Sequence, residues 1–193
     1  MITSEQVYQL FLKTEALLEG HFELTSGLHS DKYFQCAKVL QYPWYAEELC
    51  QSLCEKLNDH TFDLVVAPAV GGVVIGYEMA RLLKVRALFT ERANGVMTLR
   101  RGFEIKPGEK ALVMEDVTTT GGSVKEVLEV VRSLGADAQA VGALVDRSGG
   151  QVDFGIPYQS LMQVQVNTYH PDDCPLCATS SAIKPGSRSL SKS

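Results

Sequence analysis

The sequence predicts an α/β protein with a central, mostly parallel sheet that is flanked by helices. Short runs of apolar residues, typical of strands buried on both faces, alternate with stretches in which apolar residues recur at helical spacing. Several of these runs are followed directly by small or glycine-rich residues that open the next helix. This strand–helix–strand order is typical of parallel sheets with helices on their faces.

The expected elements follow one another along the chain. Helical spacing predicts helices over residues 4–18, 43–57, 71–83 and 121–134. Apolar runs predict buried strands at residues 64–67, 85–89, 111–114 and 140–145. Between the second and third strands, the pairs Asn94-Gly95 and Arg101-Gly102 predict turns around short alternating segments. We expect a single domain over residues 1–193, with a mobile, Ser-rich tail from about residue 178.

Composition and charge exclude several classes of function. Apolar residues make up 45% of the chain, which fits a packed core and excludes wholesale disorder. The formal charge of −5 is unfavourable for general nucleic-acid coating, because such binding depends on neutralising phosphates. The longest uncharged apolar run, residues 64–77, is shorter than the roughly 18–20 residues of a membrane span. Charged residues interrupt the first twenty positions, so we expect a cytoplasmic protein without a secretory signal or membrane partner.

The five cysteines do not indicate a disulfide framework, because their number is odd. Cys50 and Cys54 lie four apart on a predicted helix and are expected in the core. Cys174 and Cys177 form a single CxxC motif, with His170 four residues upstream. This motif lacks the second half of a zinc site, so a reduced protein without protein metal ligands is the simplest interpretation. A local metal or redox role remains the alternative.

The chemistry is concentrated in residues 113–123, VMEDVTTTGGS. A buried strand ends there in Glu115 and Asp116, and a loop of small residues then opens a helix. Parallel sheets bind ligands at the carboxyl ends of their strands, and the N–H groups at a helix N-terminus suit a phosphate. Two carboxylates cannot attract that phosphate, but they can accept hydrogen bonds from sugar hydroxyls. The segment therefore predicts a site for a phosphorylated sugar.

The same segment closely resembles the phosphoribosyl pyrophosphate (PRPP) signature of type I phosphoribosyltransferases, and other segments narrow the resemblance to orotate phosphoribosyltransferases. Residues 21–35, HFELTSGLHSDKYFQ, resemble that family's substrate loop, and residues 67–73, APAVGGV, its pyrophosphate loop. Residues 91–109 stand where the family has its mobile catalytic loop, and residues 144–150, LVDRSGG, resemble its orotate-binding segment. The CPLC…KPGSR ending is similar to that of one bacterial branch.

The resemblance implies the type I phosphoribosyltransferase fold, with a small N-terminal hood over about residues 1–40 and a mobile hairpin loop at about 90–109. It implies Mg²⁺-dependent transfer of the phosphoribosyl group from PRPP to orotate, which yields orotidine 5′-monophosphate and pyrophosphate in pyrimidine (UMP) biosynthesis. It also implies a homodimer in which the mobile loop covers the partner's site. Mg²⁺ retains waters and prefers phosphate oxygens, so PRPP can carry most of its ligands.

The resemblance also assigns the site residues. Those expected to bind PRPP are Val70, Gly71, Gly72, Arg92, Arg100, Arg101, Glu115, Asp116, Val117, Thr118, Thr119, Thr120, Gly121, Gly122 and Ser123. Those expected to bind orotate are Tyr33, Phe34, Thr119 and Arg147, and those expected to act in catalysis are Arg100, Arg101 and Asp116. Backbone groups of Thr25, Ser26 and Gly27, and the side chains of His29 and Lys32, are further candidate ligand contacts.

Three features depart from the family pattern. Glu115 stands where many members have an aspartate, and Thr25 stands where many have a lysine. Residues 90–103 contain arginines but no lysine or histidine, whereas many members carry both there. Arginine stays protonated at working pH, so it stabilises charge but is a poor proton donor. We therefore expect Arg100 or Arg101 to stabilise the pyrophosphate electrostatically.

Three alternatives stay open. A transferase for a purine base is disfavoured, because purines carry no carboxylate for Arg147 to bind. A PRPP-sensing regulator that binds nucleic acid would need a basic face, which the acidic composition does not favour. The chain is also too short to contain a decarboxylase domain, and the sequence does not say whether it associates with a separate one.

Overall fold

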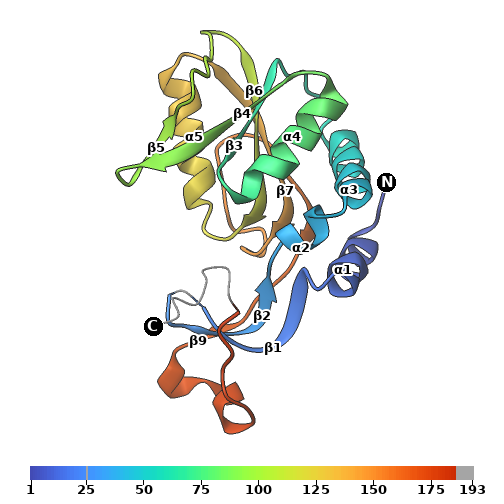
Figure 1. Cartoon of the computed structure of the whole chain (residues 1–193), viewed down its shortest axis with the longest axis vertical. Helices are drawn as coiled ribbons and strands as arrows, with labels where there is room; N and C mark the ends of the chain where they lie inside the picture. Colours follow the sequence, from blue (N-terminus) through green and yellow to red (C-terminus); the bar gives the residue numbers. More distant parts are fainter. Residues whose placement is uncertain (25, 186–193) are drawn as a thin grey trace.

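The computed structural model describes residues 1–24 and 26–185 (Figure 1). Thr25, a candidate ligand contact, and residues 186–193, the end of the predicted tail, lie outside the described residues. Within the described part of the chain, no helix is long and apolar enough to cross a membrane.

A six-stranded sheet forms the body of the molecule (Figure 1). Its strands are β3 (Leu64–Pro68), β4 (Arg86–Ala93), β5 (Val96–Leu99), β6 (Lys110–Thr118), β7 (Asp137–Asp146) and β8 (Tyr158–Gln163). Their order across the sheet is β5-β4-β3-β6-β7-β8. All neighbouring strands are parallel except β4 and β5, which form an antiparallel hairpin. This topology confirms the predicted fold class.

Helices cover both faces of this sheet. The helices α1 (Ser4–Lys13), α3 (Pro43–Lys56) and α4 (Gly71–Leu83) pack on one face, and α5 (Gly122–Ser133) packs on the other. A short helix, α2 (Ala37–Leu40), precedes α3. Along β3, Val65 and Ala67 join the first core cluster, whereas Leu64 and Val66 join the second. Successive strand side chains point to opposite faces, so this strand is apolar throughout because both faces are covered.

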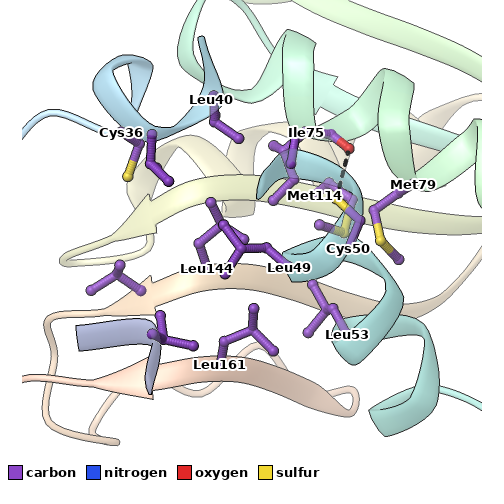
Figure 2. Packing of buried hydrophobic residues seen from close by; sticks show 14 of the residues in the cluster. Cys36, Leu40, Leu49, Cys50, Leu53, Ile75, Met79, Met114, Leu144 and Leu161 are labelled. Carbon is purple, nitrogen blue, oxygen red and sulfur yellow. Dashed lines mark hydrogen bonds between the residues drawn. The ribbon is translucent and has the colours of Figure 1, made fainter. Parts of the chain in front are cut away.

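Figure 2 shows the core on the α3 and α4 side of the sheet. The fully buried side chains there include Leu49, Cys50 and Leu53 of α3, Ile75 and Met79 of α4, Met114 of β6 and Leu144 of β7. The Cys50 thiol points to the carbonyl oxygen of Ile75, 4.0 Å away, and burial raises its pKa. Cys50 is thus a core residue, as predicted, and all five cysteines are free.

The hood is a separate three-stranded sheet with the order β1-β2-β9, below the main body in Figure 1. Its strands are β1 (Leu17–Glu23), β2 (His29–Phe34) and β9 (Thr168–Tyr169), and all pairs are antiparallel. Two short 3₁₀ helices, η1 (Pro171–Asp173) and η2 (Pro175–Ala178), follow β9. The hood is therefore built from both ends of the chain, not from the first 40 residues alone.

The first helix is shorter than the predicted span of residues 4–18. Thr3 caps it in a capping box with Gln6, and the helix ends at Lys13. Glu15 then adopts a left-handed backbone conformation with a φ of 57°, which turns the chain into β1. Leu17 continues the helical spacing of apolar residues, but it is buried as a strand residue.

Residues 180–185 of the predicted tail lie along β1. The Ile183 N–H donates to the His21 carbonyl, and the Glu23 N–H donates to the Ile183 carbonyl, both at 2.9 Å. Lys184 forms an ion pair with Glu23 at 2.8 Å. Backbone hydrogen bonds and a surface ion pair make this contact. Neither can be predicted from the apolar pattern of the sequence.

Gly121 is expected to be sensitive to substitution. It opens α5 with a φ of 75°, and a Cβ there would lie 2.8 Å from the side chains of Phe154 and Val152. We expect Gly121→Ala to lower the free energy of unfolding by about 2–4 kcal/mol, because left-handed strain and overpacking add. Gly155→Ala is the matched control, since Gly155 has a φ of 70° but open space around it.

The control should lose only about 1 kcal/mol, which corresponds to the backbone strain alone. Urea unfolding of both variants measures the difference. Equal losses would show that Phe154 and Val152 yield to the added methyl group.

Candidate active site

The candidate site lies at the carboxyl ends of three neighbouring strands. Because β3, β6 and β7 are parallel neighbours, the loops that follow them meet at one edge of the sheet. A Cβ at Gly71 would lie 2.9 Å from both carboxylate oxygens of Asp116. The loop after β3 therefore reaches the acidic pair of β6, and only a glycine allows this close approach.

The loop after β6 forms a small hollow at the N-terminus of α5. Residues that line it include Glu115, Thr118, Thr119, Gly121, Gly122 and Ser123. The first N–H groups of a helix have no partner inside the helix, and its dipole is positive at this end. The hollow thus offers backbone donors to an anion, and Glu115 lies at its border.

Glu115 is buried and Asp116 is partly buried, and neither forms an ion pair within the residues that the structure describes. Glu115 is only 8% exposed, and the Asp116 N–H donates to its carboxylate at 3.2 Å. The Val117 N–H donates to the Asp116 carboxylate at 2.9 Å. Burial raises the pKa of both carboxyl groups, and repulsion by Asp116 raises the pKa of Glu115 further. The pair is suited to accept hydrogen bonds from hydroxyl groups or to face a positive charge.

Arg147 lines a larger cleft beside this loop. The cleft has a volume of about 660 Å³, and its lining includes Thr119, Thr120, Arg147, Ser148 and Thr168. The Arg147 N–H donates to the Thr118 carbonyl at 2.8 Å, which ties the arginine to the end of β6. Burial lowers the pKa of Arg147, and its Nε is buried without a hydrogen-bond partner in the described part of the chain. This open donor suits an anionic ligand.

Phe34 supports the Arg147 side chain from β2. Its ring centroid lies 5.5 Å from the guanidinium carbon, and the ring is 9% exposed. Tyr33, the next residue along β2, is half-buried and packs against Phe22 instead, with ring centroids 6.0 Å apart. Since neighbouring strand residues point to opposite faces, the two aromatic rings do not form one stacking surface.

Comparisons with known proteins show the family to which the chain belongs. A family model described as the phosphoribosyl transferase domain matches residues 45–171. The orotate phosphoribosyltransferase of Carboxydothermus hydrogenoformans is 56% identical over 185 residues, which cover 94% of this chain and 97% of that protein. The one of Desulforamulus reducens is 54% identical over 187 residues, which cover 96% and 98%. The chain belongs to the orotate phosphoribosyltransferase family.

A solved structure shows that the fold is shared more widely. The crystal structure of orotate phosphoribosyltransferase from Aeropyrum pernix has a TM-score of 0.69 to this chain at 24% identity. The match covers 82% of this chain and 93% of that one. Membership confirms the resemblance drawn from the motifs, and the sheet with its helices is the fold of type I phosphoribosyltransferases.

The loop arginines lie on the β4–β5 hairpin and the turn after it, where acidic partners hold them. Arg100 and Arg101 both form ion pairs with Glu91, at 3.3 and 3.0 Å. Arg92 pairs with Glu126 of α5 at 2.9 Å. All three arginines are exposed. In this arrangement their positive charge is neutralised on the hairpin and on α5.

Two other candidates have local partners. Lys32 forms an ion pair with Glu19 at 3.4 Å. His29 is buried, and its Nδ1 lies 2.8 Å from Nε2 of His21.

Sequence reasoning missed Asp146, which shapes the turn that carries Arg147. Its side chain is fully buried, and its carboxylate accepts hydrogen bonds from the Ser148 N–H at 2.8 Å and the Gly150 N–H at 3.1 Å. An aspartate followed by serine and two glycines is a recognisable signal for such a turn. Glu91 was also missed, and nothing in the local sequence shows that it pairs with the arginines.

We expect Glu115→Gln to stabilise the free protein. The folded-state pKa of Glu115 is raised above its ordinary value of 4.5, so its contribution to stability is complete below that value and is lost as the pH rises through the folded pKa. Glutamine removes the charge but keeps an oxygen for the Asp116 N–H. The free energy of unfolding should rise by about 1–3 kcal/mol at neutral pH.

The gain should shrink as the pH falls toward 4.5, and urea unfolding across this range measures it. Glu109→Gln is the control with the opposite sign, because the Lys106 N–H and Arg86 lower the pKa of Glu109. Its carboxylate contributes stability above its unfolded pKa and loses it in acid. A Glu115→Gln variant that is less stable at neutral pH would contradict the burial argument.

Proposed function

We propose that this protein transfers the 5-phosphoribosyl group from PRPP to orotate and releases pyrophosphate, in pyrimidine biosynthesis. The observation that carries the proposal is the Glu115–Asp116 pair beside an anion-binding hollow, which shares Thr119 with the Arg147 cleft. A ligand with a phosphate, two sugar hydroxyls and an anionic base matches these three parts in turn. Family membership supports the same substrates.

The reaction breaks the bond between the ribose C1 and pyrophosphate and forms a bond from C1 to a ring nitrogen of orotate, whose N–H proton passes to the leaving pyrophosphate or to water. Positive charge builds on the sugar and negative charge on the leaving group, so positioning and electrostatics are the protein's main tasks. We assign the 5′-phosphate to the hollow formed by residues 117–123. Glu115 and Asp116 would accept hydrogen bonds from the 2′- and 3′-hydroxyls, and positive charge that builds on the sugar would favour their ionised form.

The pyrophosphate is assigned to residues 69–72 and to the loop arginines. The first segment offers backbone N–H groups next to Asp116. Arg100 and Arg101 would exchange Glu91 for the pyrophosphate when the hairpin closes over the site. Both stay protonated, so they stabilise the leaving group without donating a proton. Arg92 would leave Glu126 in the same way.

Orotate is a planar anion, and we assign its carboxylate to Arg147. A guanidinium binds a carboxylate with two parallel hydrogen bonds, and the Phe34 ring holds this guanidinium in place. Thr119 lines the same cleft as Arg147, so we assign it a contact with the base. This geometry gives Phe34 a positioning role and leaves Tyr33 as a candidate contact.

The residues present fit Mg²⁺ that arrives with PRPP. The Glu115 and Asp116 carboxylates are oxygen donors that lack a cation, and Mg²⁺ prefers such donors while it retains waters. When bound, the ion would neutralise part of the negative charge of the pyrophosphate. The two carboxylates orient the ribose in either case.

We further propose a homodimer in a reducing cytoplasm, with the hairpin of one protomer covering the site of its partner. Trp44 on α3 and Val74 and Tyr77 on α4 are large apolar residues with exposures of 61%, 47% and 66%. Val74 and Tyr77 lie one turn apart on α4, which packs against α3, and exposed apolar patches mark interaction surfaces. The five free thiols fit a reducing compartment.

Substrate specificity tests the proposed function directly. With Mg²⁺ and PRPP, the protein should consume orotate and release an equal amount of pyrophosphate, which absorbance and pyrophosphate assays measure. Adenine, hypoxanthine and uracil should give no nucleotide, because they lack the carboxylate that Arg147 binds. Turnover of a purine without turnover of orotate would overturn the proposal.

Arg147 and Arg101 should affect different kinetic constants. Arg147→Ala is expected to raise the KM for orotate roughly 10- to 100-fold, because a charged hydrogen-bonded partner is lost. Arg101→Ala is expected to lower kcat roughly 10- to 100-fold with little change in that KM, because it acts on the leaving group. Arg132→Ala, an exposed residue of the last turn of α5, is the control.

A mixture of the two variants tests whether the hairpin acts in the partner's site. Mixed dimers would then contain one site with both arginines intact, and random exchange of protomers should restore roughly a quarter of the wild-type activity. If each hairpin serves its own protomer, no site regains both residues, and at orotate concentrations well below the raised KM the mixture stays as weakly active as the single variants. That result would refute the shared loop but leave the orotate activity in place.

A further inference from the structure

A second group of chemistry-bearing side chains lies in the hood, and the proposed reaction does not use it. His21 on β1, His29 on β2, and Cys174 and Cys177 in the segment after β9 bring one ligand atom each to a common point. These four atoms all lie within 4.8 Å of one another. The contributing segments are about 150 residues apart in the chain, so the fold alone brings them together.

The spacing of these atoms is close to that of a tetrahedral metal site. The Cys174 Sγ lies 3.5 Å from the His21 Nε2, and the Cys177 Sγ lies 3.8 Å from the same nitrogen and 3.3 Å from the His29 Nδ1. Zinc bonds of about 2.3 Å to sulfur and about 2.0–2.1 Å to nitrogen place neighbouring S and N ligands about 3.5 Å apart. The two imidazole nitrogens are closer, at 2.8 Å.

The ring orientation of His21 provides a second, independent observation. Its Nδ1 lies 2.9 Å from the Ser180 carbonyl oxygen, which can only accept, so Nδ1 carries the proton and donates. In the neutral ring, Nε2 then holds a lone pair aimed at the cluster. Metal-binding histidines are held in the same way, with the other ring nitrogen donating to a backbone carbonyl.

Within the described residues, few apolar contacts hold the segment after β9 to the β1–β2 hairpin, although Ile183 and Lys184 pair with β1. The buried side chains near the four ligand atoms include the polar residues His21, His29 and Ser30. The apolar Phe22 is also buried, but it belongs to neither core cluster of the described residues. A sheet of three short strands has too little apolar surface to be stable alone. Small structures of this kind are commonly stabilised by a metal or a disulfide.

We propose that His21, His29, Cys174 and Cys177 bind one Zn²⁺ ion in a structural Cys₂His₂ site. The ion fastens the segment after β9 to the β1–β2 hairpin, and Leu24, Gly27 and Leu28 near the tip of this hairpin belong to the expected substrate loop. Thiolate and imidazole donors select zinc over Mg²⁺, and four protein ligands leave no open position for substrate. His170 is not a ligand, because it is exposed and pairs with Asp172 at 3.3 Å.

Metal analysis of the intact, untagged chain tests the proposal. The protein should be produced with zinc in the medium and purified under reducing conditions without chelators. Elemental analysis should find about one zinc per chain. Exchange for Co²⁺ should give the visible absorption of a tetrahedral site together with thiolate-to-metal charge-transfer bands, which a histidine-only or surface site would not give.

Variants connect the metal to these residues. Cys177→Ser and His29→Gln should lose most of the zinc, whereas Cys54→Ser should keep it, because Cys54 lies on α3 next to Met79. The zinc content of the wild-type chain decides the matter even if a variant fails to fold. A folded wild-type chain without zinc, a Cys174–Cys177 disulfide that persists under reducing conditions, or zinc retained in both ligand variants would overturn the proposal.

Discussion

Two adjacent carboxylates, one buried and one partly buried, lie at the end of β6, and the candidate site depends on this arrangement. Glu115 and Asp116 stand where the strand leaves the sheet, and both have raised pKa values because water is largely excluded from them. Burial of like charges opposes folding, so the surrounding sheet must offset the cost. It does so with β3, β6 and β7, whose apolar residues are buried on both faces. The acidic pair therefore lowers the stability of the free protein, but its two carboxylates are already held in fixed positions.

The same arrangement explains why the neighbouring loops contain small residues. Gly71 approaches Asp116 so closely that a methyl group would contact the carboxylate, and Gly121 meets Phe154 and Val152 on the other side. The loop after β3 therefore reaches Asp116 with its backbone. Backbone N–H groups point in fixed directions, so they can hold phosphate groups without reorganising during the reaction. The loop arginines contrast with this rigid part, because Glu91 holds them in an exposed hairpin.

The sequence predicts the parts of the fold that arise from local burial. The apolar patterns correctly indicate the strands β3, β6 and β7 and the helices α3, α4 and α5. These elements bury their apolar residues in the core between the sheet and its helices. The strands β8 and β9 and the end of the first helix were not predicted correctly. A two-residue strand such as β9 is defined only by its partner, and the apolar side chain of Leu17 fits a strand as well as a helix.

The site shows the same division. Residues 115–123 and Arg147 could be found because each motif lies within one strand end and its loop. The support of Arg147 by Phe34, and the ion pairs of Glu91, depend on where distant strands meet, so no local pattern reveals them. The pyrophosphate loop and the hairpin were assigned through the family resemblance, since their glycines and turns alone also fit an ordinary connection.

The cluster of four ligand atoms in the hood depends even more strongly on contacts between distant segments. The CxxC motif was incomplete in the sequence because the histidines that face it lie about 150 residues earlier, on β1 and β2. Neither histidine stands at a spacing that a metal motif predicts, and each alone is typical of an ordinary polar core residue. Only the antiparallel pairing of β1 with β2, and of β2 with β9, directs the four side chains to one point. A hood with little core of its own, assembled from both ends of the chain, is where a single metal ion contributes most, because it replaces apolar contacts that three short strands cannot make.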